Sequence, residues 1–190
     1  MAVTAKGTPY VESSDLVANY PGTSLALANH IDDTAGKVLQ VVSVTKTDTF
    51  SASVAAGANT AITGLSVTIT PQLASSKVLI FGTVFGRGSN QNGFNAALAR
   101  GSTLINLGDA AGSRSRAGGA GYVDTTFHVA GIPLMFLDSP ATTAATTYNI
   151  YAINLDIGTR TVFVNRSEND SDLVNYVRTS SVITVMEISA

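Results

Sequence analysis

The residue types that most often carry chemistry are scarce in this chain of 190 residues, which has two histidines and no cysteine. A structural zinc site would have to rely on carboxylates, because no thiolate ligand is available. His128 could form a Ser-His-Asp arrangement with Asp124 or Asp138, but no G-x-S-x-G turn is present to carry the serine. We therefore interpret His30 and His128 as hydrogen-bonded structural residues.

The acidic residues offer two further chemistries. Asp170, Ser171 and Asp172 resemble part of a calcium loop, since alternate oxygen ligands suit a hard cation. The loop glycine and the distal glutamate are missing, so the pattern favours a solvated turn. A glycosidase needs two carboxylates at a defined separation, which sequence spacing does not give for any pair among Asp48, Asp109, Asp124, Asp138 and Asp156. The sequence predicts a protein that is not an enzyme and has no cofactor or metal.

One Gly/Ala/Ser-rich stretch, residues 108–121, carries Asp109, Arg114 and Arg116 and no large apolar side chain. Such a stretch buries little and is predicted to be a surface loop. Its two guanidinium groups could bind carboxylates or phosphates of a partner or a cell-surface glycan. They could equally pair with Asp109 and Asp124 or contact a neighbouring subunit. These residues are our candidate receptor or subunit contacts.

From Lys37 onward, apolar side chains recur at every second position, with almost no helical pattern. The elements that position the candidate residues are therefore predicted to be strands. Leu65, Val67 and Ile69 alternate with polar residues, which predicts a strand with one solvent-exposed face. The pattern of residues 94–107 predicts a tight hairpin. The pattern of residues 54–64 predicts a loop. We predict an all-β, jelly-roll-like β-sandwich over residues 37–190. Its further strands are expected at residues 37–50, 77–86, 122–130, 133–138, 147–155, 160–165 and 181–189.

The stretch at residues 77–86 is apolar on both faces, with Val78, Ile80 and Val84 on one and Leu79, Phe81 and Phe85 on the other. Each sheet of a sandwich has only one face in the core. We hypothesise that this strand and the two-sided strands at 147–155 and 181–189 share one sheet, whose outer face is an oligomer interface. The alternative is exposed Val and Ile side chains of the kind that strands tolerate. The pattern does not decide which face of 77–86 is the interface.

Residues 1–36 differ from the rest and are predicted to form a short, partly helical segment. One helix could run from Ser13 or Ser14 to Tyr20 and another from Thr23 to Asp33. A short helix needs a docking surface in water. Leu27 and Ile31 form a narrow apolar edge that could meet symmetry mates or the β-domain. The alternative is an extended arm.

The composition excludes two classes of partner. The formal charge is −2, which gives no basic surface for nucleic acid. No apolar run approaches the roughly 20 residues of a membrane span, and no signal peptide pattern is present. We therefore expect a protein that is made in the cytosol and has no membrane insertion.

The β-rich part contains, in this order, the blocks GKVLQVVSVTKTDTFS, ITGLSVTITPQLASSKVLIFGTV, LARGSTLINLGDAAGSRSRA, FLDSPATTAATTYNIY, VFVNRS and SSVITVMEIS. Together they resemble a β-domain of virion proteins of tailed bacteriophages, especially marine phages, often found in tail fibres or related appendages. The resemblance covers nearly all of residues 36–190. It implies a structural and adhesive protein that is commonly trimeric, with no catalytic residues to transfer and with residues 1–36 attached to another virion protein.

The leading expectation is therefore a homotrimeric tail-fibre or spike-like appendage of the virion, with loops presented to the host surface, including host glycans. A capsid decoration or cement protein is the second reading. A glycan-degrading spike is the third. The sequence does not choose between tail and capsid.

Overall fold

The computed structural model describes residues 2–3, 9–10, 24, 37–90 and 93–189. Two short strands, β1 (Ala2–Val3) and β2 (Pro9–Tyr10), pair with each other. The predicted N-terminal helices, with Leu27 and Ile31, lie outside the described residues. The sandwich is built from β3 (Val38–Lys46), β4 (Phe50–Val54), β5 (Asn59–Ile69), β6 (Lys77–Gly88), β7 (Phe94–Arg100), β8 (Thr103–Leu104), β9 (Gly119–Gly121), β10 (Ala130–Asp138), β11 (Thr146–Ile153), β12 (Arg160–Val164) and β13 (Ser181–Ile188).

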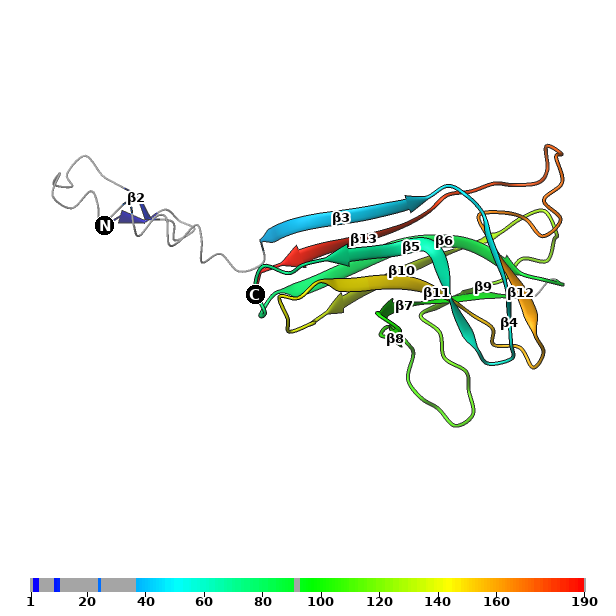
Figure 1. Cartoon of the computed structure of the whole chain (residues 1–190), viewed down its shortest axis with the longest axis horizontal. Helices are drawn as coiled ribbons and strands as arrows, with labels where there is room; N and C mark the ends of the chain where they lie inside the picture. Colours follow the sequence, from blue (N-terminus) through cyan, green and yellow to red (C-terminus); the bar gives the residue numbers. More distant parts are fainter. Residues whose placement is uncertain (1, 4–8, 11–23, 25–36, 91–92, 190) are drawn as a thin grey trace.

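Two antiparallel sheets form the sandwich (Figure 1). In the first, here called the β6 sheet, β6 pairs with β10 on one side and with both β13 and β12 on the other. Thr83 of β6 pairs with Val182 and Gly86 pairs with Val164, so β12 and β13 follow one another along the same edge. β4 and β3 extend this sheet beyond β12 and β13. In the second, the β11 sheet, β11 lies between β5 and β7, and β8 and β9 pair with the far edge of β7.

The strand order is that of a jelly roll. When β3–β4, β8–β9 and β12–β13 are each counted as one interrupted strand, the two sheets of the sandwich have eight strands among the described residues. The β6 sheet then has the order 1-8-3-6 and the β11 sheet the order 2-7-4-5. Nearly every connection therefore crosses from one sheet to the other, as in a rolled-up pair of Greek keys. The predicted all-β, jelly-roll-like class is confirmed.

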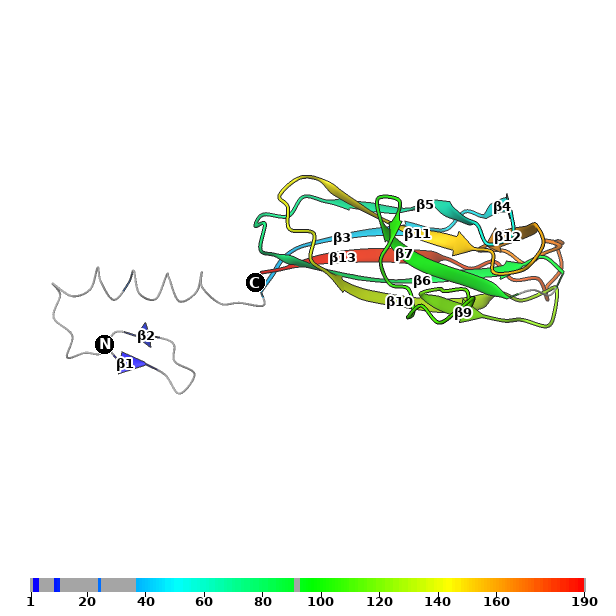
Figure 2. The ribbon, with the colours of Figure 1, turned by 90° about the horizontal axis from the view of Figure 1, so that it is seen from below.

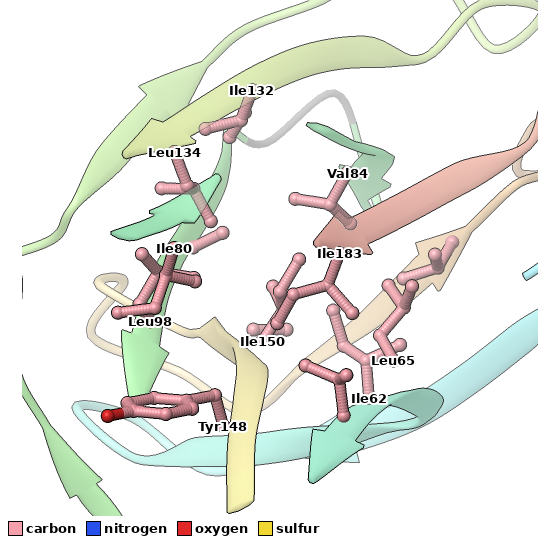
Figure 3. Packing of buried hydrophobic residues seen from close by; sticks show 14 of the residues in the cluster. Ile62, Leu65, Ile80, Val84, Leu98, Ile132, Leu134, Tyr148, Ile150 and Ile183 are labelled. Atoms are coloured by element: carbon pink, nitrogen blue, oxygen red, sulfur yellow. The ribbon is translucent and has the colours of Figure 1, made fainter. Parts of the chain in front are cut away.

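The core lies between the sheets and is made by alternate residues of each strand. Ile80, Val84 and Ile183 of the β6 sheet face Leu98 and Ile150 of the β11 sheet (Figure 3), and all of these side chains are fully buried. Each contributes roughly 1.5–3 kcal/mol by leaving water. Gly82 allows β6 and β13 to approach closely, because a Cβ there would lie 2.5 Å from the carbonyl oxygen of Val182.

The two faces of β6 are now distinguished. Val78, Ile80 and Val84 point into the core and are fully buried. Leu79, Phe81 and Phe85 point outward, and Phe81 is 37% exposed. The expectation that all three two-sided strands share a sheet was right for β6 and β13, which are neighbours, and wrong for β11. β11 belongs to the other sheet because its partners, β5 and β7, are fixed by crossover connections that local periodicity does not reveal.

Two local predictions were also wrong. Residues 59–64 are part of β5 and not a loop, because they pair with β11 across a bulge where Gly64 has a φ of +86°. A glycine inside a strand commonly marks such a bulge. Residues 122–129 form a loop and not a strand, because contacts with Arg87 and Tyr176 replace sheet pairing there.

The long connections gather at one end of the sandwich. Residues 121–129, 154–159 and 165–180 lie at the end opposite to the start of β3 and the end of β13 (Figures 1 and 2). We call this the loop end. Residues 105–118, between β8 and β9, project separately from the side of the sandwich (Figure 1).

Candidate functional site

The outward surface of the β6 sheet, here called the outer face, is apolar across several strands. Register places Val41, Met186, Leu79 and Leu137 in one row across the sheet, so four strands contribute an apolar side chain at the same level. Val41 is 52% and Leu137 is 49% exposed. The next row towards the loop end contains Ser43, Thr184, Phe81 and Met135. A surface of this kind marks an interaction site when it is large and contiguous.

A hollow of about 640 Å³ lies on the outer face between β10 and β13. Its floor is formed by Gly82 and Thr83 of β6, which carry small side chains or none. Pro133 and Val182, the register partners of Thr83, line its two sides. The larger side chains that border it are Phe81 and Met135.

The outer face is covered at the loop end by the chain itself. Arg87, the last outward residue of β6, is fully buried. Its guanidinium donates to the carbonyl oxygens of Gly88 and Thr125, and its Nη2 lies 2.8 Å from Oε2 of Glu168. Burial lowers the pKa of Arg87, and the Glu168 carboxylate opposes that effect. The same carboxylate accepts a hydrogen bond from the backbone amide of Asn90.

The covering segments, residues 121–129 and 165–180, also hold each other. The rings of Phe127 and Tyr176 meet edge to face at 5.0 Å, and the amide of Val177 donates to the carbonyl of Phe127. Arg178 donates twice, at 2.6 Å, to the carboxylate of Asp170. These contacts fix two long connections in a single arrangement.

The supposed calcium-loop residues belong to this network. Asp170 is half-buried and its carboxylate is held by Arg178 and, at 3.6 Å, by Arg166. Ser171 and Asp172 are exposed, so the predicted solvated turn matches the structure at these two residues and not at Asp170. Among the residues that the structure describes, no cluster of His, Asp and Glu could hold a metal ion.

The candidate contact residues Asp109, Arg114 and Arg116 are all exposed on the projecting loop. Nη1 of Arg114 donates to the carbonyl of Ala111 at 3.4 Å. In the described parts of the chain, no ion pair joins either arginine to Asp109 or to Asp124. The internal pairing considered from the sequence is therefore not formed, and both guanidinium groups face solvent.

A polar contact joins the two sheets at Asp138, one of the two aspartates that the sequence offered as a catalytic partner for His128. Asp138 of β10 accepts a hydrogen bond of 2.7 Å from the hydroxyl of Tyr148 and pairs with Arg100 at 2.9 Å. Burial, followed by this hydrogen bond, raises the pKa of Tyr148 above its ordinary value. His128 is exposed on its loop, with Nδ1 lying 3.0 Å from Oγ1 of Thr125. The arrangement of His128 with Asp138 is not made, because the carboxylate is committed to Tyr148 and Arg100.

The structure brings three of the predicted interface residues, Leu79, Phe81 and Phe85, onto the outer face and adds residues that the sequence did not single out. The most exposed of these is Met135, at 73%. Strict alternation from Gly131 to Leu137 signals an outward row on β10, but only the sheet order shows that this row lies beside Phe81. No helix in the described residues is long and apolar enough to cross a membrane.

The fold defines the protein as a jelly-roll β-sandwich. No family model and no curated protein matches the chain. Solved structures with some likeness are the VP2 subviral particle of infectious bursal disease virus (12% identity, TM-score 0.38), a mutant VP2 of that virus in derived T=1 particles (14%, 0.40) and the Gt strain of the same virus (14%, 0.40). Each covers 83% of this chain, which spans 38–39% of theirs. At these TM-scores the likeness adds nothing to the argument made from the strand order.

Proposed function

We propose that the protein is a non-enzymatic structural component of a virus particle, in which three copies associate and present their loops for adhesion to the host surface. The observation that carries this proposal is the apolar outer face, which the described residues leave uncovered between its edge and the loop end. Large exposed apolar faces are avoided by monomers and are typical of subunit interfaces. The resemblance to phage appendage proteins supports the same reading, with residues 1–36 attached to another virion protein.

The first test is the mass of the full chain in solution. Light scattering after size exclusion at micromolar concentration should give the mass of three 19.5 kDa chains. The Phe81→Asp variant should be a folded monomer, because a trimer would have to desolvate three carboxylates in its interface. The control is Ser66→Asp, since Ser66 is exposed on the outward side of β5 and should leave the trimer intact. A wild-type monomer would contradict the proposal.

The virion role is tested on the particle itself. A labelled image of the virion should place the protein on an appendage, and glycan-array binding by the isolated trimer would support adhesion. The exposed Arg114 and Arg116 are the first candidates for that contact. Loss of particle stability without the protein, with no glycan binding, would instead indicate a decoration protein. Release of reducing sugar from host polysaccharide would indicate a glycan-degrading spike.

A further inference from the structure

We infer that the copies meet head to tail around the threefold axis, with Met135 and Phe81 of one copy seated in the hollow of the next. This inference rests on the proposed trimer and specifies how its surfaces fit. Met135 is 73% exposed and stands at the border of a hollow whose floor carries only Gly82 and Thr83. A projection and a recess of the same apolar chemistry therefore occur on one face. A second copy supplies the complement to both.

The charge on the outer face favours a second copy as the occupant. The charged residues of the outward side of β6 are Lys77, at the edge of the sheet, and Arg87, which is already paired with Glu168. The rows between them, from Leu79 to Phe85, contain no charged side chain on β6, β10 or β13. Identical surfaces that carried net charge would repel each other, whereas these can approach without leaving an unpaired charge.

The size of the face sets the extent of the contact. Four strands about 4.8 Å apart, each with about eight residues rising about 3.4 Å, give roughly 500 Å² in projection per copy. In a ring of three this face is divided between two neighbours, so the copies bury roughly 1,500 Å² together and roughly 500 Å² at each contact. One contact alone is smaller than the total of about 1,000 Å² of a specific interface, so the trimer depends on all three contacts closing together.

The positions of the projection and the recess favour a ring. Met135 belongs to β10, on one side of β6, and the recess extends across to Val182 of β13 on the other. Met135 and Phe81 border the recess and Val182 lines its opposite side, so side chains seated from the next copy would contact Val182 and the floor at Gly82 and Thr83. Contacts between unlike surfaces are heterologous, and they close into rings when the rotation allows.

Cysteine cross-linking can test this arrangement directly, because the natural chain contains no cysteine. In one subunit, Met135 and Val182 lie on strands that flank β6 and pair with Phe81 and Thr83, two residues apart. Their Cα atoms are therefore about 12 Å apart, beyond the separation of about 7 Å that a disulfide spans. The variant Met135→Cys with Val182→Cys should therefore link only between copies. On oxidation it should give covalent dimers and trimers on a denaturing gel.

The single variants complete the test. Val182→Cys should stay monomeric on the denaturing gel when oxidised alone, because Val182 lines the hollow and is not seated in the next copy, and the two single variants should give covalent dimers when mixed. The double variant Ser66→Cys with Ile157→Cys is the control. These side chains are exposed away from the outer face and should not link. Linking of Val182→Cys to itself would indicate a twofold contact and overturn the inference.

Failure of this inference is separable from failure of the proposed function. A wild-type trimer whose Met135→Cys, Val182→Cys variant keeps the trimeric mass but does not cross-link would overturn the head-to-tail contact alone. If the cysteine substitutions weaken the trimer, the contact is tested instead by amide hydrogen exchange of β6 and β10 in the wild-type protein. Their amides should become at least tenfold more protected in the trimer than in the diluted monomer, and equal protection would overturn the inference.

Discussion

Glu187 shows how one buried carboxylate fastens a connection between the two sheets. It is fully buried on β13, where it accepts hydrogen bonds from Nε2 of Gln40 at 2.6 Å and from the amide of Gln72 at 2.7 Å. Burial opposes its ionisation, but these hydrogen bonds and one from the amide of Leu73 outweigh it and lower the pKa of Glu187 below 4.5. The carboxylate thereby holds the turn that joins β5 to β6.

The lowered pKa of Glu187 predicts a loss of stability in acid. The unfolded chain binds the proton more readily than the folded chain, so this contribution is full above the ordinary pKa and is lost as the pH falls through the folded value. Glu187→Gln should lower the free energy of unfolding at pH 7 by about 1–3 kcal/mol, because backbone donors lose a charged acceptor. It should also flatten the pH dependence below 4.5. Urea unfolding followed by circular dichroism between pH 3 and pH 7 measures both.

The matched control is Asp124→Asn, which removes an exposed carboxylate from a loop. A surface change of this kind should stay within about 0.5 kcal/mol of the wild type. A Glu187→Gln variant with wild-type stability at pH 7 would show that the carboxylate does not hold the turn.

The role of Glu187 could not be read from the sequence. Residues 181–189 predict a strand with two apolar faces, and β13 has that character on most of its length. The acceptor role depends on Gln72, which lies 115 residues away in the chain. Periodicity reports which side chains share a face, but it does not report which distant backbone groups need a partner.

At the scale of the elements, β12 and β13 form one interrupted strand with a long insertion between them. Asn165 closes the junction: its Nδ2 donates to the carbonyls of Lys46 and Asp48, and its Oδ1 accepts from Ser181 at 2.6 Å. The sequence predicts both strands within a residue or two. It does not show that they lie in line, because that relation is set by their common partner, β6.

The ion pair between Arg87 and Glu168 should anchor this insertion. Arg87→Met leaves Glu168 without its partner, and Glu168→Gln leaves a buried guanidinium, so each change should cost about 3 kcal/mol. The double variant should lose clearly less than the two combined, because no unpaired charge remains. Urea unfolding gives the coupling, and limited proteolysis should cut residues 165–180 faster in each single variant.

The pair of Arg160 with Asp156 provides the comparison, since both side chains are partly exposed. Arg160→Met should cost no more than about 1 kcal/mol. Additive losses at Arg87 and Glu168 would refute an anchoring pair.

At the scale of the whole molecule, the sequence predicted that one face of β6 is an assembly surface, but it did not show which of the two faces. The strand alone could not decide, because Val78, Ile80 and Val84 are as apolar as Leu79, Phe81 and Phe85. The neighbouring strands show which face is outward: the β11 sheet covers Val78, Ile80 and Val84, and β10 and β13 place further apolar side chains beside Phe81.

An apolar interface predicts a distinctive dependence on conditions. Trimer association should change less than about threefold in Kd between 0.05 and 1 M NaCl, because screening acts on charges and the outer face carries few. It should weaken on cooling and show a negative heat capacity change in calorimetric dilution. A strong loss of association with salt would point instead to contacts through Arg114 and Arg116.

The antiparallel pairing of β3 with β13 has a mechanical consequence. Val38 pairs with Ile188, so both ends of the sandwich emerge side by side from neighbouring strands. Hydrogen bonds of an antiparallel pair run perpendicular to the strands. Tension between residue 37 and the loop end is directed along the strands and loads these bonds together in shear. Tension between residues 37 and 189 would open the same bonds one after another, so the domain should resist pulling along its length far better than pulling apart of its two neighbouring ends.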